Sequence, residues 1–164
     1  MRQFIDSIPK VIHQIWLGPL EPPKGAIESW VLNHSDWDYH LWTEKNLPSL
    51  KNQAAFDASD NYPQKADILR YEILSMYGGV YFDADVYNLK SIDSLYEQWL
   101  SEGVSLVAAM EGSEDRPDLI ANTFIASVPG HAFMDKLVEG IDIKRAGGAW
   151  EITGPQYFTN SVAK

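Results

Sequence analysis

The chain has 164 residues, with 13 Lys and Arg against 23 Asp and Glu, which gives a formal net charge of −10 at pH 7. This length fits one domain, and 45% hydrophobic with 22% charged residues is typical of a packed globular protein rather than a disordered one. The chain has no cysteine, which excludes disulfides, thiolate metal sites and a cysteine nucleophile. The acidity argues against nucleic acid as a partner, because phosphate backbones bind through Lys and Arg.

The sequence also bears on membrane and secretion signals. No apolar run approaches the roughly 20 residues that cross a bilayer, and residues 1–10 lack the apolar stretch of a secretion signal. We therefore expect a cytoplasmic protein with a single domain over residues 1–164 and no integral membrane segment. If its ligand is anionic, a group other than Lys and Arg has to neutralise much of the ligand's charge.

The first half of the chain predicts two strands and two helices. Residues 11–17 are largely β-branched and apolar, which is typical of a strand buried on both faces. A helix is expected from the proline pair 22–23 to residue 32, because proline is tolerated in a first helical turn, and the aromatic alternation of 37–42 predicts a second strand. The clearest helix spans 63–77, where apolar residues recur every three or four positions along one stripe and two glycines follow.

The second half predicts a similar alternation. A short strand at 80–82 leads into two aspartates, and a helix is expected over residues 92–100. The apolar run 104–110 predicts a short core strand, 122–128 a weaker strand, and 131–140 another helix. Because strands and helices alternate along the chain, the predicted fold class is α/β.

Asp83 and Asp85 form the first candidate site. Two carboxylates one residue apart, at the end of a buried strand, converge where the strand becomes a loop, and ligands of open α/β sheets bind at such strand ends. Carboxylate oxygens suit a hard divalent cation such as Mg²⁺ or Mn²⁺. The alternative is structural, because aspartate is also common as a turn residue.

Asp67 and Arg70 form the second candidate site. They lie three residues apart and so share a face of the 63–77 helix. A surface ion pair of little energetic value is one interpretation. The other follows from the tight turn after the helix: a helix packed antiparallel to the 80–82 strand brings both side chains towards Asp83, where Arg70 can meet phosphate or sugar oxygens.

Aromatic and histidine residues near the strands leave further alternatives. Trp16 and Tyr81 can stack on a base or a sugar, or belong to the core. The four histidines show no metal-ligand spacing, and His13 within an apolar strand is expected to be a core residue with satisfied hydrogen bonds. Neither GxxxxGK[ST] nor GxGxxG occurs, so the known backbone cradles for phosphate are missing.

Three segments, taken together, resemble a known family. IPKVIHQIWLG at 8–18, KADILRY at 65–71 and YGGVYFDAD at 77–85 resemble, in order and spacing, the DXD-containing sugar transferases. These include the initiating α-mannosyltransferases of yeast, bacterial capsular and lipopolysaccharide glycosyltransferases and, more distantly, the clostridial glucosylating toxins. The resemblance covers about half of the chain, with weaker echoes around residues 122–131 and 153–155.

The resemblance implies a GT-A fold, that is, a Rossmann-like mixed sheet flanked by helices, and a metal-dependent, retaining glycosyltransferase. Mn²⁺ or Mg²⁺ would bridge Asp83 and Asp85 to the diphosphate of a UDP- or GDP-sugar donor, and the acceptor would be a hydroxyl group of a glycan. Together with Arg70, these two aspartates are the expected catalytic residues, because the departing diphosphate gains negative charge.

Carried over position by position, the resemblance implies that Trp16 stacks on the nucleobase and that Asp67 and Arg70 hold the donor sugar. Tyr81 would lie beside the diphosphate or ribose, and Asn122 would point at the sugar.

One departure from the family concerns length. Relatives usually continue well beyond the Thr-Gly-Pro segment at 153–155, so we expect a catalytic domain that is short at its C-terminal end. Two other functions remain open. One is an Asp-nucleophile phosphohydrolase of the haloacid-dehalogenase kind, although about 80 residues precede Asp83 here and that motif normally lies on the first strand. The other is a module that binds the donor but turns it over weakly or not at all. The sequence predicts no oligomeric state.

Overall fold

The computed structural model describes residues 7–162, and in this range five strands form one sheet in the order β2-β1-β3-β5-β4. The strands are β1 (Val11–Ile15), β2 (Asp38–Trp42), β3 (Gly79–Phe82), β4 (Leu106–Met110) and β5 (Ile120–Ser127). β1 runs parallel to β2 and β3, whereas β5 runs antiparallel to β3 and β4. The predicted α/β class, with a mixed sheet flanked by helices, is confirmed.

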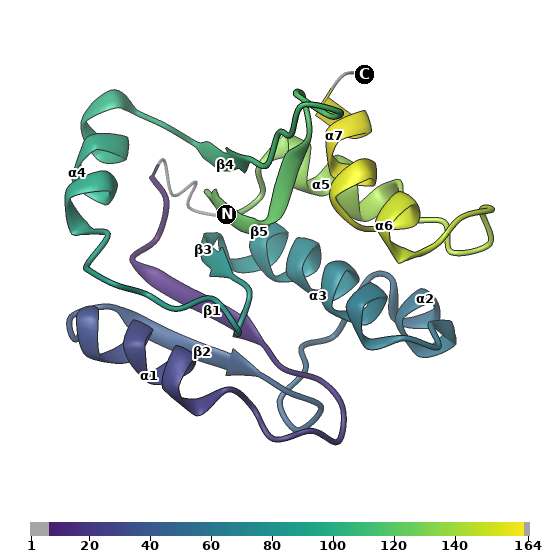
Figure 1. Cartoon of the computed structure of the whole chain (residues 1–164), viewed down its shortest axis with the longest axis horizontal. Helices are drawn as coiled ribbons and strands as arrows, with labels where there is room; N and C mark the ends of the chain where they lie inside the picture. Colours follow the sequence, from purple (N-terminus) through teal and green to yellow (C-terminus); the bar gives the residue numbers. More distant parts are fainter. Residues whose placement is uncertain (1–6, 163–164) are drawn as a thin grey trace, which may run out of the picture.

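Helices cover both faces of this sheet (Figure 1). They are α1 (Lys24–Asn33), α2 (Gln53–Ala58), α3 (Tyr62–Tyr77), α4 (Asp93–Glu102), α5 (Ala132–Glu139), α6 (Ala149–Ile152) and α7 (Pro155–Val162). None of those in the described range is long and apolar enough to cross a bilayer.

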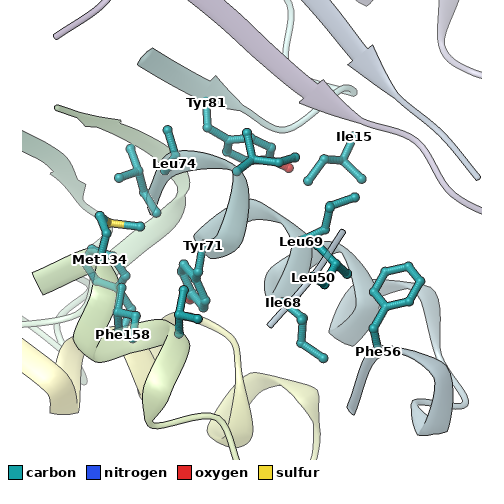
Figure 2. Close-up of a cluster of buried hydrophobic side chains, with 14 of the residues drawn as sticks. Ile15, Leu50, Phe56, Ile68, Leu69, Tyr71, Leu74, Tyr81, Met134 and Phe158 are labelled. Atoms are coloured by element: carbon teal, nitrogen blue, oxygen red, sulfur yellow. The ribbon is translucent and has the colours of Figure 1, made fainter. Parts of the chain in front are cut away.

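Two hydrophobic clusters form the core, one on each face of the sheet. The larger joins the sheet to α3, α5 and α7, and Figure 2 shows Tyr71 and Phe158 within it. The smaller joins the other face to α1 and α4 and includes Trp30. Because Ile12 belongs to the smaller cluster and Ile15 to the larger, the prediction that the first strand is buried on both faces is confirmed.

Helix α3 is the central helix of the fold, and its bounds agree closely with the prediction. It begins after Asn61, whose side chain accepts a hydrogen bond of 2.9 Å from the backbone N–H of Gln64, the usual N-cap arrangement. The prediction of a single apolar stripe was too narrow. Every residue from Asp67 to Leu74 is buried, because α3 packs against both the sheet and α5.

Other differences concern short elements and strand order. Helices α2, α6 and α7 were not predicted, and α7 buries Tyr157 and Phe158 although its sequence is largely polar. The 104–110 run was expected to be a core strand, but β4 lies at the edge of the sheet and is only half-buried. An edge strand has a neighbour on one side only, and periodicity does not reveal which strand takes that position.

Candidate active site

A cleft of about 720 Å³ opens at the ends of β1 and β3. Its walls come from residues 15–20 after β1, 62–70 of α3, 81–85 at the end of β3, and 149–155 of α6 and the start of α7, together with Asn122. Parallel strands of open α/β sheets bind ligands at their carboxyl ends, and this volume is within the roughly 300–1,000 Å³ of small-molecule sites. All seven predicted site residues line this cleft.

Two glycines set the geometry between α3 and β3. Gly78 and Gly79 have φ angles of +63° and +102°, values that favour glycine. A Cβ atom would lie 2.6 Å from Pro129 at the first position and 2.5 Å from Val11 at the second. The chain therefore reverses between helix and strand within this glycine pair, so α3 runs back along β3 and its residue Arg70 lies beside the strand's end.

Arg70 is the hub of the polar contacts in the cleft. Its Nη2 donates to Asp83 Oδ1 at 2.8 Å and to the Tyr81 hydroxyl at 3.1 Å. Its Nη1 donates to the backbone carbonyl of Asn122 and lies 3.3 Å from Asp67 Oδ1. Nε is buried and has no hydrogen-bond partner among the described residues. Arg70 is therefore not a surface ion pair: its side chain is only 5% exposed.

Asp67 is held by side chains from two distant segments. Its Oδ1 accepts from Asn122 Nδ2 at 2.8 Å and its Oδ2 from Thr153 Oγ1 at 3.0 Å. Burial raises the pKa of the Asp67 carboxyl above its ordinary value, against the opposing charge of Arg70. The Tyr71 hydroxyl completes the network by donating to the Thr153 carbonyl at 2.6 Å.

Thr153 and Tyr71 were missed by the sequence analysis as members of this network. Tyr71 lies inside the KADILRY segment, and Thr153 opens the Thr-Gly-Pro segment, so both were visible as parts of motifs. Their contacts span 82 and 86 residues of sequence. Such long-range pairing follows from tertiary packing rather than from local spacing.

The charge states of the buried groups follow from their neighbours. Burial alone would lower the pKa of Arg70, but Tyr81 and Asp83 raise it above its ordinary value, so the guanidinium stays charged. Burial raises the pKa of the Tyr81 hydroxyl well above its ordinary value, so Tyr81 is neutral and donates to Asp83 Oδ1 at 2.8 Å. The guanidinium of Arg70 also lies 4.4 Å from the centre of the Tyr81 ring.

The two carboxylates of the DxD segment differ in their surroundings. Asp83 is half-buried, and its Oδ1 is engaged by Arg70 and Tyr81. No hydrogen bond within the described residues engages its Oδ2 or either carboxylate oxygen of the exposed Asp85. Three oxygens on two cleft residues are thus available, which is the hard donor set that Mg²⁺ or Mn²⁺ prefers. The described residues contain no cluster of three or more acidic or histidine ligands, so a cation here would complete its shell from substrate or water.

Trp16 and Tyr81 occupy unlike positions. Trp16 is half-buried on the cleft wall, and its Nε1 donates to the Leu20 carbonyl at 2.7 Å. Tyr81 is 1% exposed and belongs to the larger core cluster (Figure 2). Its hydroxyl is the part that contacts the polar network.

His13 lies in a second, smaller hollow of about 340 Å³ at the other end of β1, beside Tyr77. Its Nε2 lies 2.9 Å from the Gly78 carbonyl, and its Nδ1 accepts from Trp42 Nε1 at 3.1 Å. The prediction that His13 is a buried residue with satisfied hydrogen bonds is confirmed.

Comparison with known proteins agrees with this geometry. The description "Glycosyltransferase sugar-binding region containing DXD motif" belongs to a family whose profile matches residues 21–102, which is 82 of the 164 residues. The match includes α3, β3 and both aspartates of the DxD segment. It favours a sugar transferase over the phosphohydrolase alternative.

Individual relatives point the same way. Inositol phosphoceramide mannosyltransferase 3 of Schizosaccharomyces pombe is 32% identical over 148 residues, covering 82% of this chain and 37% of the relative. The initiation-specific alpha-1,6-mannosyltransferase of the same yeast is 24% identical over 190 residues, covering 95% and 48%. The chain thus spans less than half the length of either relative.

A solved structure shows the same fold. PaToxG glycosyltransferase superposes with a TM-score of 0.77 at 18% identity, covering 94% of this chain and 69% of that one. The profile match, the relatives and the geometry of the cleft lead to one assignment. The chain belongs to the family of glycosyltransferases whose sugar-binding region contains a DXD motif.

Proposed function

We propose that this chain is the catalytic region of a metal-dependent, retaining glycosyltransferase of GT-A fold, forming one domain over residues 1–164. The donor is a UDP- or GDP-sugar, and mannose is the sugar favoured by the names of the relatives. The acceptor is a hydroxyl group of a glycan or glycolipid. The observation that carries the proposal is the asymmetric DxD pair: Asp83 is anchored on Arg70 through one oxygen, while its other oxygen and the Asp85 carboxylate accept no hydrogen bond from residues 7–162.

The free carboxylate oxygens are where a divalent cation would be held. Bound to Asp83 and Asp85, Mn²⁺ or Mg²⁺ would supply a Lewis acid that neutralises the diphosphate oxygens of the donor. This accounts for a phosphate-bearing ligand on a protein with a net charge of −10. It also gives a role to the arginine, because Arg70 fixes the orientation of Asp83.

Arg70 and Asp67 then serve the sugar end of the donor. Arg70 lines the cleft and keeps its charge, so its guanidinium can pair with an oxygen of the donor. Asp67 accepts hydrogen bonds from Asn122 and Thr153 and forms an ion pair with Arg70, so it holds the Asn122 amide and Arg70 in fixed positions. Asn122 lines the same cleft and is held by Asp67, so we assign it to the sugar as well.

Trp16 and Tyr81 serve the nucleotide end. Trp16 lies on the open wall of the cleft, where an indole can stack on a base. Tyr81 keeps its ring in the core, so its contribution is the hydroxyl that fixes Arg70 and Asp83. In the reaction, the bond from the anomeric carbon to the diphosphate oxygen breaks as the acceptor oxygen bonds to that carbon on the same face. The acceptor's proton passes to the departing diphosphate, so no protein nucleophile is needed.

Donor binding is tested by thermal unfolding with a panel of UDP- and GDP-sugars in the presence of Mn²⁺. The correct donor should raise the midpoint, because a ligand that binds only the folded state stabilises it. Catalysis is tested with Asp85→Asn, which should lower donor hydrolysis about 10²–10³-fold. The matched control is Asp38→Asn, because Asp38 is an exposed carboxylate on β2 outside the cleft.

Two results would contradict the proposal. Hydrolysis that survives in Asp85→Asn, or that persists after metal chelation, would remove the metal assignment. Midpoint shifts with nucleotide sugars but no turnover of any donor would identify the chain as a donor-binding module instead.

A further inference from the structure

Trp150 is a cleft residue to which neither the motifs nor the proposed reaction gives a role. It lies on α6, a four-residue helix, and is half-buried on the wall formed by residues 149–155. Trp16 provides the aromatic surface on the wall that follows β1. Trp150 therefore adds an indole on a different element from the one whose indole is assigned to the nucleobase.

The exposed Arg116 packs against the Trp150 ring. Its guanidinium carbon lies 4.6 Å from the centre of the indole, within the range of a cation–π contact. Arg116 is itself set by a tight turn between β4 and β5, in which Ser113 and Arg116 exchange two backbone hydrogen bonds of 3.1 Å. One guanidinium covers one face of an indole, so the part of Trp150 that faces the cleft is the other face or the ring edge.

The end of helix α6 is also bonded to the hydrogen-bond network around Asp67. Thr153, which directly follows α6, donates to Asp67 and accepts from the Tyr71 hydroxyl. The backbone N–H of Gly154 donates to the Ala149 carbonyl at 2.8 Å. Trp150 therefore keeps a fixed position relative to Asp67, the residue assigned to the donor sugar. A ring on Trp150 would lie in the same cleft as the reacting end of the donor.

The chemistry of an anchored indole indicates what it binds. Its negative π-face attracts the polarised C–H groups of a polyhydroxylated six-membered ring. The Trp150 Nε1–H makes no hydrogen bond within the described residues, so it can donate to a ring hydroxyl. We propose that Trp150, oriented by Arg116, is the platform on which the acceptor ring stacks. This rests on the function proposed above and names the class of acceptor as a hexopyranose or cyclitol ring.

Binding is tested without turnover by following the indole N–H signals in nitrogen-15 spectra. The chain has six tryptophans, and Trp150→Phe identifies the Trp150 signal while the other five report on folding. The probes are methyl α-mannopyranoside and myo-inositol 1-phosphate, up to about 100 mM, which would nearly saturate a site with a Kd of about 10 mM. Either probe should shift the Trp150 signal and leave the Trp16 signal in place, whereas GDP or UDP with Mn²⁺ should shift Trp16.

Arg116→Ala should weaken the binding of both probes severalfold. The affinity for the phosphorylated ring should fall more than that for the neutral ring if Arg116 also contacts the phosphate. Arg145→Ala is the matched control, because Arg145 is an exposed arginine in the loop before α6 that makes no cation–π contact within the described residues. A Trp150 signal that stays in place with both probes overturns the proposal.

Kinetics give the second readout. Trp150→Ala should raise the KM for the acceptor about tenfold and lower transfer to the acceptor far more than donor hydrolysis by water, and Trp150→Phe should recover most of the loss. Equal losses of hydrolysis and transfer would assign Trp150 to the donor and overturn the acceptor platform. If the protein neither binds nor hydrolyses any donor but the Trp150 signal still shifts with the probes, the proposed function is refuted. The ring-binding site on Trp150 is then retained.

Discussion

The two hollows beside β1 treat buried polar groups in opposite ways. At the cleft, Asp67 and Arg70 are both buried, and their opposite charges form an ion pair. At the other end of the strand, His13 is equally buried but neutral: a carbonyl only accepts and an indole N–H only donates, so its bonds to Gly78 and Trp42 leave a single ring proton on Nε2. Burial accordingly lowers the pKa of His13 to about 4.

This difference separates stability from function. Burying a neutral polar group with all its hydrogen bonds made costs less free energy than burying a charge. Buried ion pairs are often replaceable by apolar residues without loss of stability. The charges at the cleft are therefore best explained by the ligand they serve. Changes there should affect activity beyond stability, and changes at His13 should affect stability alone.

The largest effect is expected from removing the guanidinium. Arg70→Met leaves Asp67 buried without its opposite charge and Asp83 without its anchor, so the free energy of unfolding should fall by about 3–5 kcal/mol, measured by urea denaturation. The double variant Arg70→Met with Asp67→Asn removes the stranded charge and should regain most of that stability without regaining donor turnover. A single variant as stable as the wild type would break the comparison.

A smaller effect is expected at the opposite hollow when the pH is lowered. The folded chain resists protonation of His13 down to about pH 4, whereas the unfolded chain takes up this proton near pH 6.5. Between these values the unfolded state binds more protons, so stability falls as the pH falls. The loss from pH 7 to pH 5 should be about 2 kcal/mol, from urea denaturation at both values.

The control for that measurement is His13→Gln, in which the remaining titrations cancel. This variant should lose about 2 kcal/mol less than the wild type over the same pH interval, and its donor turnover at pH 7 should be unchanged. An identical pH dependence in both proteins would show that His13 is not the group responsible.

The smallest effect concerns a neutral residue at the cleft end of α3. Asn61 caps the helix through Gln64, so Asn61→Ala should lower stability by ~1 kcal/mol. Donor turnover should change less than twofold, because Asn61 is uncharged and we assign the activity of the cleft to its charged side chains. Asn61→Asp keeps an acceptor and should restore the stability. A large loss of turnover in Asn61→Ala would show that the cleft depends on the helix start as well.

Elements with strong local signals were predictable from the sequence. Helix α3 was predicted to within one residue, because Asn61 and the glycine pair mark its ends. Helix α6 was missed because four residues between glycines carry no periodicity, and its position depends on the contacts of Thr153 with α3. The edge position of β4 was missed because strand order is a tertiary property.

The site was predictable only in part for the same reason. The motifs and the tight turn predicted that Asp67 and Arg70 lie close to Asp83. What they did not reveal is how the contacts are divided: Tyr81 gives its hydroxyl to the site and its ring to the core. Packing decides such assignments, and Thr153 enters the site only because α6 folds onto α3.

The glycine turn between α3 and β3 also constrains how this protein can vary. Arg70 and Asp83 are 13 residues apart in sequence and in direct contact, and no loop lies between helix and strand to absorb a change in length. One residue inserted in the last two turns of α3 would rotate Arg70 by about 100° and displace it by about 1.5 Å relative to the strand. The ion pair would be lost although no side chain had been substituted. Length variation in this chain is therefore expected in the surface loops, while the segment from Arg70 to Asp83 keeps a fixed number of residues.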